Sequence, residues 1–237
     1  MIRDRRVLRR TLVALVVAGS LATVGASGLA AAAAPVSPTQ ELVTFTRSTI
    51  VHSKPAASSP ALAKVSGTTP ITGESTVLPV MGIYKQWLLV RLPGRPAGRT
   101  GWIAQSSTTT RSVTPWHVVV DTAARTIAVY RSGHRVRVIS TVVGKASTPT
   151  PAGDFFVEER ITLGPGAVGA PYALALSARS AVLQDFEGGP GQIAIHGLEN
   201  VGGVPGTAVS HGCLRVATAD VRWLVQKIGP GVPVTIR

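Results

Sequence analysis

The chain has 237 residues, with 24 Lys or Arg against 11 Asp or Glu, and a formal net charge of +13 at pH 7. A hydrophobic content of 45% beside 15% charged residues excludes disorder throughout the chain, because enough apolar surface is present to bury a core. The single cysteine excludes an intramolecular disulfide and any zinc site built from several cysteines.

The first 34 residues have the pattern of an export signal. Residues 1–10 contain five Arg, and residues 11–34 carry no charge and end in Ala32-Ala33-Ala34 before Pro35. A basic start, an apolar stretch and small residues at the end are typical of a cleaved secretory signal. The alternative is an uncleaved membrane anchor, because 24 uncharged residues reach spanning length. Either alternative predicts an extracytoplasmic protein of the cell envelope or cell wall.

The positive charge is spread along the rest of the chain. Residues 40–112 carry eight basic and two acidic residues, and residues 113–237 carry eleven and eight. Such a charge is compatible with nucleic-acid binding, but the Arg residues are scattered and no nucleic-acid motif is present. We therefore expect no nucleic-acid partner, and attraction to an anionic cell envelope or a merely soluble basic surface explains the charge.

Residues 40–107 are expected to form a small β-barrel. Short β-branched or aromatic runs lie at 41–47, 48–54, 76–82, 87–94 and 101–107, between Gly, Pro and Ser residues. The stretch from Trp87 to Leu92, followed by Gly94 and by Gly101-Trp102-Ile103, resembles the closing part of a bacterial SH3-like domain. The resemblance implies binding of peptide or cell-wall polymer, and a spacer without a ligand is the alternative. The polar residues 108–115 are expected to be a linker.

Residues 116–237 are expected to form a β-sandwich with one packed helix. The segment 117–144 alternates in polarity and breaks at Asp121-Thr122 and Ser132-Gly133, which predicts hairpin turns. Further strands are expected at 154–161, 172–178, 191–197 and 232–236. A helix is expected at 217–228, started by Thr218 or Asp220 and followed by Gly229. The predicted fold class is therefore mainly β.

The candidate chemistry lies at His196 and at the string Ser210-His211-Gly212-Cys213. A buried, inert Cys is the ordinary alternative for a lone cysteine. Here, however, the thiol follows a Gly in a polar loop of an exported protein, where an idle thiol is easily oxidised. A nearby His can take the thiol proton and then pair with the thiolate, and the sequence does not distinguish His196 from His211 in this role.

Two further features of this string bear on its chemistry. The backbone amides of Gly212 and Cys213 are candidates for an oxyanion hole, which stabilises the negative charge formed during acyl transfer. Zinc is the rival interpretation, because His196, His211 and Cys213 together offer the three protein ligands of a catalytic zinc site.

Three strings resemble the signature of the L,D-transpeptidase family, whose catalytic domain is of the YkuD type. They are Ile195-His196-Gly197, the string from Ser210 to Arg215, and the upstream segment from Thr148 to Phe155. The resemblance spans residues 116–237 and makes a metal unnecessary, so no metal and no cofactor are expected. It implies that Cys213 is the nucleophile and His196 the proton acceptor and donor.

The resemblance also implies roles for the neighbouring residues. The Gly197 carbonyl would orient His196, and His211 and Gly212 would flank the oxyanion region. Ser210 matches the residue that opens the string, and Ser210, Gly197 and Arg215 are expected on the substrate side. Arg215 would bind a substrate carboxylate through its fork of donors, with a structural salt bridge as the alternative.

The implied activity is cross-linking of peptidoglycan stem peptides through a thioester on Cys213, and carbapenems are expected to acylate the same residue. The alternatives are a carboxypeptidase that uses water as acceptor, and a non-catalytic module that binds the cell wall through residues 40–107. A membrane contact is expected only through residues 11–34, if these are not cleaved.

Overall fold

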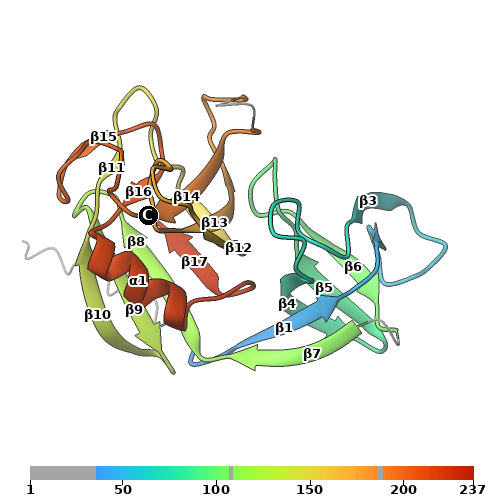
Figure 1. Cartoon of the computed structure of the whole chain (residues 1–237). Coiled ribbons are helices and arrows are strands. Elements are labelled where there is room, and N and C mark those ends of the chain that lie inside the picture. The colour runs from blue at the N-terminus through green and yellow to red at the C-terminus, as the bar shows by residue number, and fades with distance from the viewer. Residues whose placement is uncertain (1–35, 107–108, 186–188) are drawn as a thin grey trace, which may run out of the picture. The chain divides into compact units, whose positions relative to one another are not determined.

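Residues 36–106, 109–185 and 189–237 are described in a computed structural model, and strands are the main regular structure among them (Figure 1). The residues of the expected leader, 1–34, lie outside this described part. No helix among the described residues is long and apolar enough to span a membrane.

The N-terminal strands form a seven-stranded sheet in the order β3-β2-β6-β5-β4-β1-β7 (Figure 1). Its members are β1 Gln40–Phe45, β2 Thr49–His52, β3 Ala61–Val65, β4 Thr76–Tyr84, β5 Trp87–Arg91, β6 Thr100–Ala104 and β7 Thr109–Thr114. The five expected strands are confirmed, and β3 is an addition that the mixed composition of its five residues did not indicate. The likeness of this sheet to an SH3-like domain stays a prediction.

The expected linker at 108–115 is wrong for residues 109–114, which form strand β7. This strand pairs antiparallel with β1 along its whole length, from Gln40 opposite Thr114 to Phe45 opposite Thr109. It lies at the edge of the sheet and most of its side chains are exposed, so its sequence is polar. Three Thr residues still favour a strand, because β-branched side chains suit extended backbone.

The second sheet has eight strands in the order β10-β9-β8-β17-β12-β13-β14-β16, and a two-stranded parallel sheet, β11-β15, lies beside it. Its members are β8 Trp116–Asp121, β9 Thr126–Arg131, β10 His134–Ser140, β12 Gly153–Thr162, β13 Tyr172–Arg179, β14 Gln192–His196, β16 Leu214–Arg215 and β17 Pro233–Ile236. The small sheet consists of β11 Val143–Gly144 and β15 Ala208–Ser210.

Both predicted hairpin turns of this region are confirmed. The first joins β8 to β9, and the second joins β9 to β10 through Ser132 and Gly133. These two residues have φ values of 50° and 79°, the left-handed backbone that a two-residue hairpin turn requires. The mainly β fold class is confirmed as well.

The predicted helix is α1, Thr218–Lys227, and it buries Val221, Leu224 and Val225 against the second sheet (Figure 1). Its start differs from the expectation, because Ala217 occupies the N-cap position and no side chain caps the helix. Asp220 forms an ion pair with Arg137 instead, at 2.7 Å. Its carboxylate still favours the helix from within the first turn.

Side chains of the second sheet also complete the core under the N-terminal strands, and residues 35–237 form one compact unit. Phe156 of β12 is only 1% exposed and packs with Phe45, Leu78 and Ile103 of the N-terminal sheet. Buried Glu159 accepts hydrogen bonds from the backbone amides of Ile71 and Thr72, at 3.2 and 2.8 Å. The N-terminal strands and the second sheet are therefore joined by apolar burial and by hydrogen bonds to a carboxylate.

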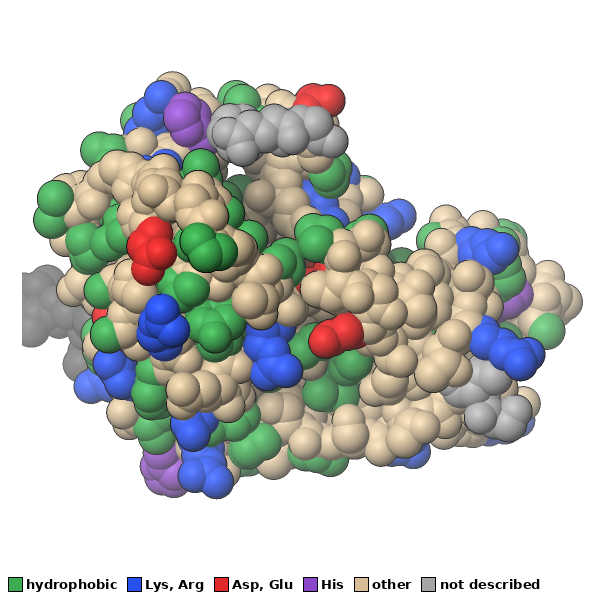
Figure 2. Space-filling view, in the orientation of Figure 1, with side chains coloured by type: hydrophobic (Ala, Val, Ile, Leu, Met, Phe, Trp, Pro, Cys, Tyr) green, Lys and Arg blue, Asp and Glu red, His purple; other side chains and the backbone are tan. Residues whose placement is uncertain are grey.

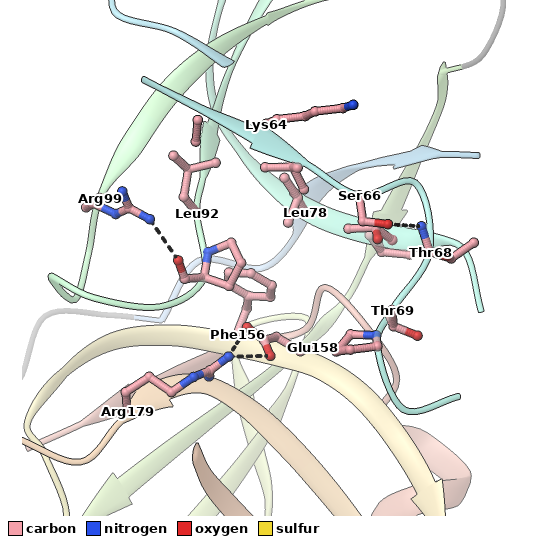
Figure 3. Close-up of a pocket in the computed structure, with 16 residues that line it drawn as sticks. Lys64, Ser66, Thr68, Thr69, Leu78, Leu92, Arg99, Phe156, Glu158 and Arg179 are labelled. Atoms are coloured by element: carbon pink, nitrogen blue, oxygen red, sulfur yellow. Dashed lines mark hydrogen bonds and ion pairs between the residues drawn. The ribbon is translucent and has the colours of Figure 1, made fainter. Parts of the chain in front are cut away.

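A cavity of about 320 Å³ opens at this junction (Figure 3). Phe156 forms its floor together with the ion pair of Glu158 and Arg179, and Leu78, Leu92 and Arg99 reach it from the N-terminal strands. Its walls are mostly apolar, and its charged groups sit at the base and the rim.

We predict that Phe156→Ala lowers the free energy of unfolding by about 3–5 kcal/mol, the usual cost of emptying a buried Phe site. Chemical denaturation followed by tryptophan fluorescence measures the loss. Val182→Ala is the matched control because Val182 is 53% exposed, and it should cost less than about 0.5 kcal/mol. Equal losses in the two variants would contradict the role of Phe156 in the shared core.

Candidate active site

Parallel pairing of two neighbouring strands brings His196 and Cys213 together. Strands β14 and β16 pair with Ile195 opposite Leu214 and His196 opposite Arg215. Extending this register back by one residue places Cys213 beside Ala194. His196 lies two residues further along β14, so Cys213 and His196 are diagonal neighbours on paired strands although 16 residues separate them in the sequence.

Successive side chains on a strand point to opposite faces, and on these two strands one of the faces lines a cavity. Gln192, Ala194 and His196 from β14 line a cavity of about 580 Å³, and so do His211, Cys213 and Arg215. The residues between them, Ile193, Ile195 and Leu214, are at most 2% exposed and belong to the core. Every second residue therefore serves the cavity, as expected for strands with one buried face.

The ring of His196 is held in one tautomer. Its Nδ1 lies 2.8 Å from the carbonyl oxygen of Gly197, so Nδ1–H donates and Nε2 is left as the acceptor. Burial lowers the pKa of His196 and the nearby Arg215 cation adds to this, while the hydrogen bond to Gly197 opposes it. The ring is therefore neutral near pH 7 and can take a proton at Nε2.

Gly169 holds the other side of this ring, and sequence reasoning missed it. A Cβ atom at Gly169 would lie 2.3 Å from His196 Nδ1, and the residue has a φ of 81°. Its carbonyl also accepts the backbone amide of Gly197 at 2.8 Å. Only glycine fits a left-handed position this close to another side chain. Nothing in the spacing of this Gly-rich stretch links it to His196.

Cys213 is half-buried at the wall of the cavity. Its thiol lies 3.9 Å from the main-chain oxygen of Gln192, a sulfur contact that ties it to the start of β14. His211 also lines the cavity, but its side chain is exposed. The half-buried, tautomer-fixed His196 is thus better arranged as a base than the exposed His211.

Ser210 and Gly212 take part in the hydrogen bonds of the loop that leads to Cys213. Ser210 is fully buried, and its hydroxyl donates to the Cys213 carbonyl at 2.6 Å, so it holds the loop and does not line the cavity. The amide of Gly212 donates to the Ser210 hydroxyl at 3.1 Å and is therefore already engaged, which argues against its role in an oxyanion hole. Gly212 adopts a φ of 121°, and a Cβ there would lie 2.9 Å from Ile193 Cδ1.

Two buried threonines hold the same loop from outside. The Thr150 hydroxyl donates to the Gly212 carbonyl at 2.8 Å and accepts the Gly144 amide at 2.9 Å. The Thr148 hydroxyl donates to the Ser210 carbonyl at 3.2 Å. The segment from Thr148 to Phe155 resembles a family string, but the sequence gave it no role. Its two threonines support the Cys213 loop.

Arg215 lies opposite His196 on β16 and also lines the cavity. Its guanidinium donates to the carbonyl of Gly202, and Arg215 forms no ion pair within residues 36–106, 109–185 and 189–237. The structural salt bridge considered from sequence is thus not found among these residues. Gly197 does not line the cavity, and its carbonyl holds His196 as described above.

No three His, Cys, Asp or Glu side chains in the described part of the chain are grouped so that they could hold a metal ion. His196, His211 and Cys213 share the cavity, but they are not arranged as a ligand set. The chemistry that the arrangement supports is that of a thiol beside a neutral imidazole.

Comparison with known proteins gives a match between residues 115–236 and the L,D-transpeptidase catalytic domain, YkuD. The chain belongs to the L,D-transpeptidase family. The YkuD protein of Bacillus subtilis is 31% identical over 122 residues, which are 52% of this chain and 66% of that protein. The chain thus matches just under two thirds of the length of this curated relative.

Solved structures of L,D-transpeptidases are similar at lower identity. An L,D-transpeptidase from Mycobacterium smegmatis is 20% identical, with a TM-score of 0.40, over 68% of this chain and 89% of that one. L,D-transpeptidase 3 from Mycobacterium tuberculosis is 14% identical, with a TM-score of 0.45, over 82% and 95%. Family membership follows from the match to residues 115–236.

We predict that Thr150→Val loosens the Cys213 loop. The change leaves the Gly212 carbonyl and the Gly144 amide without their partner, so the free energy of unfolding should fall by about 2–3 kcal/mol. The rate of Cys213 alkylation by iodoacetamide should change in the folded protein. Thr110→Val is the control, since Thr110 is exposed on β7. Unchanged stability and alkylation in Thr150→Val would show that the hydroxyl does not hold the loop.

Proposed function

We propose that this chain is an exported cysteine L,D-transpeptidase that cross-links peptidoglycan stem peptides. The observation that carries the proposal is the shared cavity of Cys213 and His196 on adjacent strands, within a domain of the L,D-transpeptidase family. The basic and apolar residues 1–34 support export to the cell envelope.

The arrangement accounts for acylation of the thiol. Nε2 of neutral His196 takes the Cys213 proton, and the thiolate attacks the carbonyl of the third residue of a tetrapeptide stem. His196 then returns the proton to the leaving nitrogen, and terminal D-Ala departs. The Gly197 carbonyl stabilises the imidazolium formed in between, since Nδ1–H stays bonded to it.

The second half of the reaction transfers the acyl group to a side-chain amine of a neighbouring stem. Splitting one amide exchange into two steps through a thioester lowers each barrier. Arg215, at the end of the cavity, is the group proposed to bind a carboxylate of the stem, because its fork of donors suits carboxylate oxygens. Residues 40–107 are proposed to contact cell-wall polymer.

Incubation with a tetrapeptide stem or a carbapenem, followed by mass spectrometry, tests the proposal. Wild-type protein should gain an adduct on Cys213 and release D-Ala from the stem, and Cys213→Ser should gain no thioester. Dimeric products select transpeptidation, and trimmed stems without dimers select a carboxypeptidase. A folded wild-type protein with neither adduct nor D-Ala release would refute both activities and favour a binding module.

We predict that His196→Ala slows alkylation of Cys213 at pH 7 by about tenfold or more, because the thiol loses its proton acceptor. In wild-type protein the lowered pKa of His196 makes the neutral ring the major form at pH 6.5, where an ordinary histidine is half protonated. Acylation should therefore decline at a lower pH than for an ordinary histidine, as the ring gains its proton.

Stopped-time alkylation and acylation between pH 5 and 9 measure both effects. His134→Ala is the matched control, since His134 is an exposed residue at the start of β10. An alkylation rate in His196→Ala equal to that of the control would exclude His196 as the base.

A further inference from the structure

The loop between β12 and β13, residues 163–171, borders the active-site cavity and also faces the ring of His196. Leu163 and Val168 from this loop line the cavity. Val168 is 58% exposed, but hydrophobic side chains are exposed over both sheets (Figure 2), so exposure alone assigns it no role. Its neighbour Gly169 is buried and faces the Nδ1 side of the His196 ring. One loop therefore borders the cavity and supports the proposed base.

A side chain at position 169 would overlap the imidazole. The three atoms nearest to a Cβ built on Gly169 are Nδ1 of His196 and the two ring carbons bonded to it, Cγ and Cε1, which would lie at 2.8 and 3.1 Å. Non-bonded carbon atoms have their optimal separation at about 3.5–4.0 Å. Because Cγ is the atom that joins the ring to the rest of the residue, the overlap is relieved only if the whole ring moves.

The backbone of Gly169 cannot easily withdraw from the ring, because both of its polar groups bond to the segment that follows His196. Its amide donates to the Glu199 carbonyl at 2.7 Å, and its carbonyl accepts the Gly197 amide at 2.8 Å. The next residue, Ala170, forms a β-bridge with Glu199. Breaking these bonds would leave buried backbone groups without partners, which is costly. A side chain at position 169 would therefore displace the ring or break this bridge.

The same bridge carries the carbonyl that fixes the tautomer of His196. The Gly197 carbonyl accepts the Nδ1–H of His196 at 2.8 Å, and the Gly197 amide donates to Gly169. A displaced ring would lose this bond, and Nε2 would no longer be fixed as the acceptor. The hydrogen bond to Gly197 thus sets the tautomer, and the bare backbone of Gly169 leaves the space that this ring position needs.

We propose that Gly169 is a positioning residue for the base. By leaving room for the imidazole and keeping the bridge to Gly197 in place, it holds His196 with Nε2 available to Cys213. Gly169 does not line the cavity and acts through His196 alone. This inference rests on the proposed function, which makes His196 the proton acceptor of the thiol.

Alkylation of Cys213 in Gly169→Ala tests the assignment, and Gly166→Ala is the matched control. Gly166 lies in the same loop with a φ of 86°, against 81° for Gly169, and nothing lies within 4 Å of a Cβ built there. Both variants carry the strain of a left-handed alanine, but only Gly169→Ala displaces the ring. At pH 7, iodoacetamide should react about tenfold more slowly or less with Gly169→Ala than with wild-type protein, and within about twofold of wild type with Gly166→Ala.

The pH profile separates a displaced base from a blocked thiol. A cysteine thiol without a base ionises by itself near pH 8.5, so the rates of Gly169→Ala and wild-type protein should converge to within about twofold at pH 9.5. In a His196→Ala background, Gly169→Ala should slow alkylation no further, because no ring remains to be displaced. A rate at pH 7 equal to that of Gly166→Ala would overturn the assignment. Slowing that persists at pH 9.5 or in the His196→Ala background would overturn it as well.

The double variant Gly169→Ala/His196→Ala also decides the assignment if Gly169→Ala fails to fold. Removing the ring removes the overlap, so the double variant should regain the thermal stability of Gly166→Ala, measured by circular dichroism. A double variant as unfolded as Gly169→Ala alone would overturn the assignment. Acylation of wild-type protein by a tetrapeptide stem or a carbapenem tests the proposed function separately: its absence would overturn that function, whereas the alkylation rates decide the role of Gly169.

Discussion

A two-residue strand, β16, pairs in parallel with β14, and the position of every side chain in the cavity follows from that register. A shift by one residue would turn Cys213 into the core and expose Leu214. The pairing is protected because Ile193, Ile195, Leu214 and Val216 are all buried beneath it. The same apolar contacts that stabilise the domain therefore also place the sulfur beside the imidazole.

Hydroxyl groups and glycines stabilise the loop before β16, which lies outside the regular hydrogen bonding of the sheet. Thr148, Thr150 and Ser210 satisfy backbone groups of the loop that leads into β16, and none of them faces the cavity. Gly169 and Gly212 allow close packing at left-handed backbone positions. The site thus depends on a surrounding set of small residues whose contribution is geometric, while the proposed chemistry is assigned to His196 and Cys213.

Local patterns in the sequence predicted much of this arrangement. Alternation and turn residues gave most strands, both hairpin turns and α1, and the strings around His196 and Cys213 indicated the candidate pair. Polar strand β7 was missed because an exposed edge needs no apolar face. Gly169 was missed because the loop between β12 and β13 brings it against His196, and Gln192 was missed because strand register brings it to the cavity. Neither can be seen in residue spacing. The roles of Ser210 and Gly212 depended on which hydrogen bonds close the loop.

The guanidinium of Arg95 donates to the carbonyls of Ser180, Leu183 and Pro190, at 2.6–3.0 Å, in the loop that leads into β14. These bonds, together with the burial of Phe156 and Glu159, attach the N-terminal strands firmly to the family domain, residues 115–236. A fragment trimmed to the family domain would expose an aromatic ring, an ionisable carboxylate and three carbonyls at once. Any other segment placed beside the family domain would therefore have to supply its own groups for these contacts.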